Sequence, residues 1–265
     1  MTLPDLSNWD ATKTALHQSL QALRSTRLLG VDPMPSDLHY GTLPTPSGAT
    51  TGPLSFGGEL RLDYLRAAAV YERDGAEVFA VGLDCYNQTS FFDAVFAAFK
   101  AAGHNLQPNH DKVTETTAFN FDKGQASTYA ALQWRMYSVL SRLKGRMYGP
   151  QTPIALWPHG FDLSTIWYAD GMDERKDPHL NFGFSPGTPD VGQPYFYFYA
   201  WPVPDGLSER VPPIVTWNSN WSTPGGVIRY DQFAGADDPD GLVLDTLTQV
   251  YNTASAMVRA NAAAD

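Results

Sequence analysis

The sequence predicts an α+β fold built from two similar halves, each with a helix, then four or five antiparallel strands, then a second helix. Three observations lead to this prediction. Apolar residues recur in long stretches at the spacing of amphipathic helices. Between these stretches, short segments alternate apolar and polar residues as half-buried strands do. The same order of elements occurs twice, which indicates an internal duplication.

The two halves are residues 1–110 and 125–265, and the polar segment 104–124 that joins them has no hydrophobic period. We expect curved antiparallel sheets with helices on their outer faces. We also expect the two halves to form one compact structural unit.

The composition is that of an acidic protein with a large core. The 265 residues carry a net charge of −10, and 43% of them are hydrophobic. Lys and Arg do not cluster, so we expect no nucleic-acid partner. No stretch approaches the roughly 18 apolar residues of a membrane span, and the first residues do not resemble a signal peptide, so we expect no membrane partner and a cytoplasmic location. A single cysteine, Cys85, excludes an intramolecular disulfide, and no sequence motif calls for a cofactor or a metal.

The first half begins with a helix that opens at a capping box, Ser7-Asn8-Trp9-Asp10, and ends at Gly30. A second capping box at Ser90 to Asp93 opens the helix that ends at Gly103. Arg73-Asp74-Gly75 is typical of a hairpin turn. The strands expected between the helices are residues 39–45, 50–56, 59–65, 69–71 and 78–83.

The second half repeats this plan. A helix over residues 125–148 is followed by strands, and an acidic segment, residues 237–240, opens the last helix, where negative charge is favourable. The expected strands are residues 154–157, 161–168, 195–201, 214–217 and 227–230.

The most distinctive segment is the strand Tyr195 to Trp201, which has six aromatic rings in seven residues. Because side chains alternate between faces, Phe196, Phe198 and Ala200 make one apolar face that should pack dry against helices. Tyr195, Tyr197, Tyr199 and Trp201 make the other face. That second face is either a core with hydrogen-bonded hydroxyls or the wall of a pocket.

The first functional hypothesis is that this aromatic half binds a small, partly apolar molecule. The candidate ligand-binding residues are Trp167, His179, Tyr197, Tyr199 and Trp217. An aromatic stripe is more often core packing, so a structural or partner-binding protein without a small-molecule site is a further alternative. The sequence predicts no oligomeric state.

A second hypothesis is an enzyme, a hydrolase or isomerase, that uses His159 with Asp162 for acid–base work. Asp162 begins a strand whose face becomes apolar, so its carboxylate needs a partner: His159, His179 or a tyrosine hydroxyl. The alternative is an aspartate that fastens its turn through backbone N–H groups.

Residues 183–187, Gly-Phe-Ser-Pro-Gly, match the pattern of a hydrolase nucleophile elbow. That elbow requires a helix directly after the serine and a backbone N–H on the next residue, and Pro186 prevents both. We therefore expect a Pro/Gly turn on an exposed loop.

Several segments together resemble an uncharacterised bacterial family of unknown function with duplicated halves. They are Leu16-His17, Arg27-Leu28, residues 51–65, residues 153–163 with Gly-Phe-Asp-Leu at 160–163, the Gly and Phe at 183–184 with Pro-Gly at 186–187, and Ala-Trp-Pro at 200–202. The resemblance spans nearly the whole chain and implies a family identity but no activity. Two positions depart from the family pattern. Ala155 stands where the family carries His, and His179 is followed by Leu180 where the family carries His-Glu at another spacing. If those residues form a catalytic or metal site in relatives, this chain lacks it.

Overall fold

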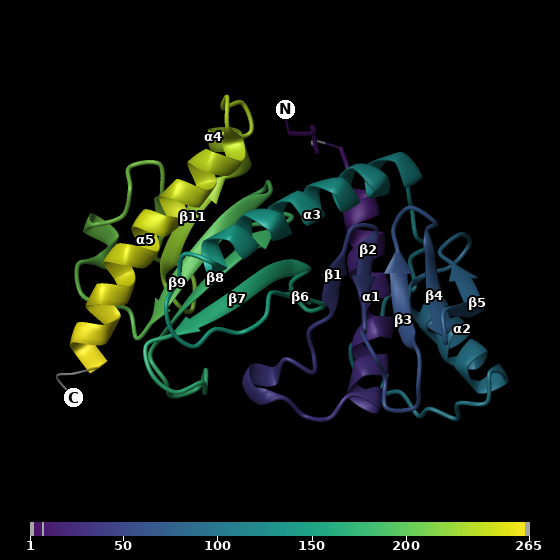
Figure 1. Cartoon of the computed structure of the whole chain (residues 1–265). Helices are drawn as coiled ribbons and strands as arrows, with labels where there is room; N and C mark the ends of the chain where they lie inside the picture. The colour runs from purple at the N-terminus through teal and green to yellow at the C-terminus, as the bar shows by residue number, and fades with distance from the viewer. Residues whose placement is uncertain (1–2, 7, 263–265) are drawn as a thin grey trace. The chain divides into compact units, whose positions relative to one another are not determined.

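The computed structural model describes residues 3–6 and 8–262 and has one five-stranded and one six-stranded antiparallel sheet, each with helices (Figure 1). This confirms the predicted α+β class with a sheet in each half. The chain divides into two compact units. The N-terminal unit comprises residues 5–134 and 155–161, and the C-terminal unit comprises residues 1–4, 135–154 and 162–265. The division therefore lies within a helix, α3 (Lys123–Lys144).

The N-terminal unit has the element order helix, five strands, helix. Its elements are α1 (Asp10–Gly30), β1 (Leu43–Thr45), β2 (Gly48–Thr50), β3 (Glu59–Asp63), β4 (Ala68–Arg73), β5 (Ala76–Gly82) and α2 (Gln88–Ala101), with a 3-10 turn, η1, at Pro35–Asp37. Each strand pairs with the next along the chain. The predicted helix stripe of Leu16, Leu20 and Leu23 is fully buried, so α1 forms one side of this core.

Glycines decide two of the turns in this unit. Asp74 and Gly75 both have positive φ angles, 53° and 77°, which confirms the predicted hairpin turn between β4 and β5. The predicted strand 50–56 is wrong, because β2 ends at Thr50. The chain then turns through Gly52 and Gly57, whose φ angles of 66° and 92° do not fit a strand.

Strand β5 forms an edge of its sheet. Within the described part of the chain it pairs only with β4. Its residues are exposed or half-buried along their whole length. The register shifts beside Tyr71, which pairs with Phe79, and Glu72, which pairs with Glu77, so Val78 is an extra, unpaired residue. The edge strand therefore contains a β-bulge.

The N-cap of helix α2 lies three residues earlier than predicted. Asn87, not Ser90, is the N-cap: its Oδ1 accepts from the backbone N–H of Ser90 at 2.9 Å, and Ser90 Oγ accepts from the N–H of Asn87 at 3.1 Å. The two side chains form a capping box, with Ser90 at its third position. The capping box predicted at residues 7–10 is wrong, because α1 begins at Asp10 with Trp9 as its N-cap and without a side-chain capping hydrogen bond; Ser7 itself lies outside the described residues.

The remaining elements follow α3. They are β6 (Ala155–Trp157), β7 (Asp162–Tyr168), β8 (His179–Ser185), β9 (Tyr195–Trp201), the 3-10 turn η2 (Leu207–Glu209), β10 (Thr216–Asn218), β11 (Gly225–Arg229), α4 (Tyr230–Phe233) and α5 (Pro239–Ala262). Within the C-terminal unit the strand order is β10-β11-β9-β8-β7. Strand β6 belongs to the N-terminal unit, where Leu156 bridges to Thr42.

The largest difference from the sequence prediction is strand β8, which was not expected. The Pro/Gly turn expected over residues 183–187 is wrong in its first three residues, because they belong to a strand that is buried at all seven positions. The turn begins only at Pro186, and Ser185 is 2% exposed. Physically, polar residues on one face of β8 and apolar residues on the other let the strand lie between β7 and β9.

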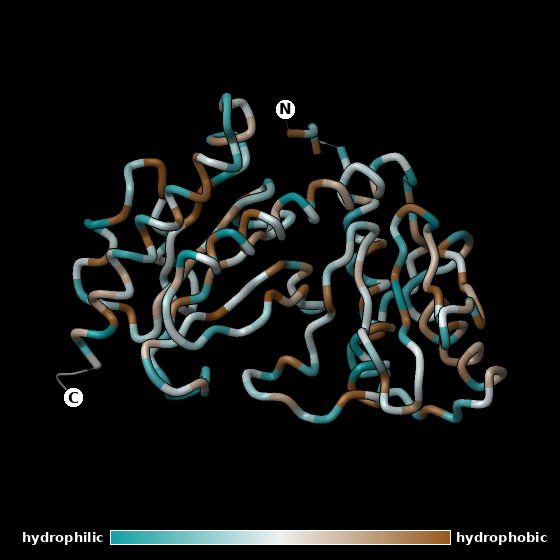
Figure 2. Tube along the Cα trace, viewed as in Figure 1, coloured by the Kyte–Doolittle hydropathy of each residue, from teal (hydrophilic) through white to brown (hydrophobic). Residues whose placement is uncertain are grey.

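One face of the C-terminal sheet packs against helices, as predicted. Phe196, Phe198 and Ala200 are fully buried there, and Phe196 contacts Phe233 of α4 with ring centroids 5.7 Å apart. Helix α5 lies along β8 and β9 (Figure 1). Apolar and polar residues alternate along α5 (Figure 2), so an amphipathic helix covers this apolar face. We call this side of the sheet the helix face.

Candidate functional site

The other side of the C-terminal sheet, which we call the polar face, carries most of the polar side chains of strands β7, β8 and β9. Register pairs Asn181 of β8 with Tyr199 of β9, and His179 with Trp201. Side chains at every second position then share the face. Its members on the three central strands are Asp162, Ser164, Ile166, Tyr168, His179, Asn181, Gly183, Ser185, Tyr195, Tyr197, Tyr199 and Trp201.

His179 lies among aromatic rings at one end of the polar face. Its ring stacks on Trp201 at 5.8 Å with an interplanar angle of 19°, and it contacts Tyr168 at 5.7 Å and Tyr199 at 6.2 Å. Nδ1 lies 2.8 Å from the carbonyl oxygen of Asp177, so Nδ1 carries the hydrogen and donates it. Burial lowers the pKa of His179, which keeps the ring neutral. Nε2 is then an acceptor without a hydrogen-bond partner among the described residues.

Asn181 is the least satisfied polar side chain of the face. It is 6% exposed, and its Nδ2 donates to the hydroxyl of Tyr199 at 2.8 Å. Its Oδ1 is buried and has no partner in the described part of the chain. Burial raises the pKa of Tyr199 to about 12, so the tyrosine keeps its proton at neutral pH. The free amide oxygen and the Tyr199 hydroxyl therefore lie together as an acceptor beside a donor.

Tyr197 and Asp162 form the next polar pair. The hydroxyl of Tyr197 donates to the Asp162 carboxylate, which confirms that a tyrosine is a partner of this aspartate. Burial and the nearby Asp162 charge raise the pKa of Tyr197 well above its usual value. The ring lies across Gly183, where a Cβ atom would overlap with Cζ and the hydroxyl oxygen of Tyr197. Gly183 thus lets the tyrosine reach across β8 to β7.

Two loops border the other end of the polar face. Thr188 Oγ1 lies 3.1 Å from the hydroxyl of Tyr195, and Trp221 Nε1 donates to Asp190 at 2.7 Å. The ring of Trp221 is 6.1 Å from Tyr195 and 6.3 Å from Tyr197. Hydrogen bonds from Thr188 and then Trp221 lower the pKa of Asp190. The loops that carry these residues therefore contact the tyrosine row, by which we mean Tyr195, Tyr197 and Tyr199 of β9.

Trp167 and Trp217, two of the predicted ligand-binding residues, do not lie on the polar face. Trp167 is fully buried on the helix face, where Nε1 donates to the carbonyl of Tyr148 at 2.7 Å and the ring contacts Tyr251 of α5. Trp217 packs against Phe198, with centroids 6.2 Å apart. The strand pairing aligns each tryptophan with a position of β9 that alternates with the tyrosines. Because side chains alternate along a strand, each tryptophan therefore points to the helix face.

His159, the predicted partner of Asp162 in acid–base chemistry, is exposed. Its ring contacts Trp157 at 5.7 Å, and it makes no hydrogen bond with a described residue. It belongs to the N-terminal unit, whereas Asp162 belongs to the C-terminal unit.

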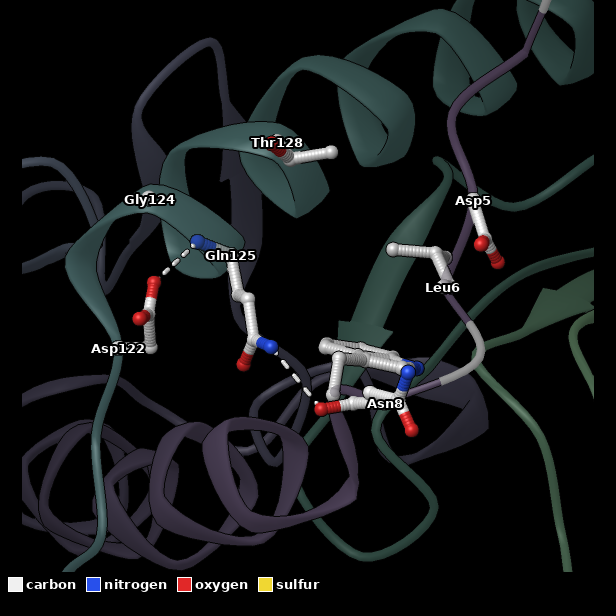
Figure 3. Close-up of a pocket in the computed structure, with 8 residues that line it drawn as sticks. Asp5, Leu6, Asn8, Asp122, Gly124, Gln125 and Thr128 are labelled. Atoms are coloured by element: carbon white, nitrogen blue, oxygen red, sulfur yellow. Dashed lines mark hydrogen bonds between the residues drawn. The ribbon is translucent and has the colours of Figure 1, made fainter.

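A separate depression of about 390 Å³ lies in the N-terminal unit, at the start of α3 (Figure 3). It is lined by Asp5, Leu6, Asn8, Trp9, Asp122, Gly124, Gln125 and Thr128. Its central side chain is already hydrogen-bonded: the amide of Gln125 donates to the carbonyl of Asn8 at 2.9 Å and accepts from Thr12 at 2.8 Å. The backbone N–H of Gln125 donates to Asp122 at 2.8 Å. These contacts join the chain's start to α3, and none of the predicted site residues takes part.

A family model described as a family of unknown function (DUF5996) matches residues 2–264. The chain belongs to this family. The resemblance to an uncharacterised family is thereby confirmed. No curated protein and no solved structure matches the chain.

In this DUF5996 chain, sequence reasoning missed Tyr168, Asn181 and the Asp190–Trp221 pair as members of the site. It placed Trp201 on the correct face of its strand but not among the ligand-binding residues. The sequence does contain a pattern that places Asn181 on a strand. Residues 179–185, His-Leu-Asn-Phe-Gly-Phe-Ser, alternate small or polar residues with apolar ones. No sequence pattern indicates that Asp190 and Trp221 lie beside the polar face, since their contact depends on how two loops fold.

Within residues 3–6 and 8–262, no group of three or more His, Cys, Asp or Glu side chains could hold a metal ion. In the same residues, no helix is both long enough and apolar enough to cross a membrane.

Proposed function

We propose that this DUF5996 chain binds a small, partly apolar molecule on the polar face of its C-terminal sheet. The observation that carries the proposal is the buried Oδ1 of Asn181, which has no partner among the described residues. Leaving a buried acceptor unsatisfied costs about 1–3 kcal/mol. A ligand that donates a hydrogen bond to Oδ1 would offset this cost.

The surroundings of Asn181 suit such a ligand. Tyr197 and Tyr199 are half-buried and Trp201 is 36% exposed, so their rings retain accessible apolar surface. Polar groups are few and well placed, as is typical of small-molecule sites: the amide of Asn181, Nε2 of His179 and the carboxylate of Asp162. A face made only for core packing would bury these rings completely, as the helix face does with Phe196 and Phe198.

The acid–base alternative has less support. His159 is exposed and makes no hydrogen bond with a described residue, so nothing orients its ring as a general base requires. We expect the protein to act in the cytoplasm, since its single cysteine, Cys85, cannot form an internal disulfide.

The test is a screen of a general fragment library by ligand-observed NMR against wild type and two variants. Asn181→Leu removes the free acceptor at similar volume, and Trp217→Phe changes a ring on the helix face only. Fragments that use the polar face bind wild type and Trp217→Phe but lose at least about ten-fold in affinity with Asn181→Leu, the effect of one strong hydrogen bond. A thermal melt of each variant first shows that it folds. If all hits bind Asn181→Leu as tightly as wild type, the polar face is not the site.

A further inference from the structure

The polar face offers a ligand mainly hydrogen-bond acceptors. Asn181 contributes its unpaired Oδ1, and His179 contributes Nε2, because its Nδ1–H is held by the carbonyl of Asp177. The carboxylate of Asp162 lies farther along the face and already accepts from the hydroxyl of Tyr197. An ammonium group has three N–H donors and no acceptor, so its needs match this set.

The charges that act on this face are negative. Glu174 and Asp162 both act on Tyr199 by Coulomb repulsion of its ionised form. Asp162 and Asp190 act in the same way on Tyr195 at the other end of the row. Two basic side chains of this unit are held in ion pairs: Lys176 lies 3.3 Å from Asp173, and Arg229 lies 3.4 Å from Asp231. The net field at the face therefore favours a cation.

The aromatic rings also favour a cation at this face. His179 and Trp201 are stacked, and Tyr199 meets the imidazole edge-on, so two π-faces border the acceptors. Trp201 is 36% exposed and can still receive a ligand. A cation over the face of Trp or Tyr is attracted by the ring quadrupole, and this attraction grows as water is excluded.

We infer that the polar face is a site for a small organic cation: a protonated primary amine on an apolar body, with the ammonium group at Asn181 Oδ1 and His179 Nε2. This inference rests on the proposed binding function and specifies its ligand class. The apolar body would lie along the rings of Tyr199 and Trp201.

The test compares three probes that share a phenyl ring and a short chain but differ in charge: 2-phenylethylamine, 2-phenylethanol and 3-phenylpropanoate. Each is titrated into the full chain by isothermal calorimetry at neutral pH, up to about 10 mM, which covers affinities near 1 mM. We expect the amine to bind at least about ten-fold more tightly than the alcohol, and the carboxylate to bind weakest. Asn181→Leu should remove the preference for the amine.

A second variant keeps the test decisive if Asn181→Leu does not fold. Glu174→Gln, on the loop before β8, removes a negative charge without changing the core and should weaken the amine but not the alcohol. Equal or tighter binding of the alcohol or carboxylate, sensitive to Asn181, would overturn the cation inference and leave the binding function standing. The inference also fails if none of the three probes binds while library fragments do. An absence of hits in the fragment screen would instead remove the binding function itself.

Discussion

Replacing Gly183 with alanine tests whether Tyr197 lies across β8 as described. The added methyl group would overlap with the Tyr197 ring, which must then move away from the Asp162 carboxylate. Overpacking costs about 1–3 kcal/mol, and loss of a hydrogen bond to a charged group costs about 1.5–3 kcal/mol. Alanine is favoured over glycine within a strand by about 0.5–1 kcal/mol, so the net loss should be about 2–5 kcal/mol.

The matched control is Gly82→Ala, at the end of β5. There the nearest atom to an added Cβ is the carbonyl oxygen of Ala67 at 3.9 Å, which is ordinary contact. We expect this variant to be neutral or slightly more stable. Urea unfolding followed by circular dichroism compares both variants with wild type, and a double-mutant cycle adds Tyr197→Ala. If Gly183→Ala costs the same with and without the tyrosine ring, the steric reasoning is refuted.

Three further predictions concern pH, a helix cap and a core ring. Burial lowers the pKa of His179 in the folded state, so below pH 6.5 the unfolded chain binds more protons and the protein loses stability as pH falls. His179→Gln should remove up to about 1.4 kcal/mol per pH unit of this loss. Wild-type melting curves that do not change between pH 7.5 and pH 5, about 1 unit above and about 1.5 units below the ordinary histidine pKa, would contradict the assignment. Asn87→Ala should destabilise α2 by about 0.5–2 kcal/mol, seen as faster amide hydrogen exchange in its first turn, and unaltered exchange there would argue against the capping box. Trp167→Phe loses the hydrogen bond to the Tyr148 carbonyl and should cost about 1–3 kcal/mol in urea unfolding while leaving ligand affinity on the polar face unchanged.

The sequence predicts local structure well where one pattern decides it. Strand β9 occupies residues 195–201 as expected, because alternation within seven residues determines which side chains share a face. The hairpin at Asp74 and Gly75 is equally local, since two positive φ angles need such residues. Strand β8 was missed because Gly183 and the following Pro-Gly suggest a turn, whereas its neighbours on both sides stabilise it as a strand.

The site was only partly predictable, for a physical reason. Whether Trp217 shares a face with Tyr197 depends on the register of β10 and β11 against β9, which is set by contacts far apart in sequence. The amide oxygen of Asn181 is unpaired because the only hydrogen bond that its side chain makes with a described residue is the one from Nδ2 to the hydroxyl of Tyr199. No spacing rule encodes either relation. Composition did indicate the half that contains the polar face, since the tyrosine row lies in the aromatic-rich strand block.

The bulge at Val78 has a consequence for how copies of this chain behave in concentrated solution. A flat, apolar edge strand is a template on which another chain can add a strand, and β5 is an edge strand rich in apolar residues. The extra residue twists the edge and interrupts its row of N–H and C=O groups, and the net charge of −10 keeps copies apart. Deleting Val78 would leave a continuous edge. We expect that variant to form assemblies most readily near the pI of about 4.9, where mutual repulsion between copies vanishes.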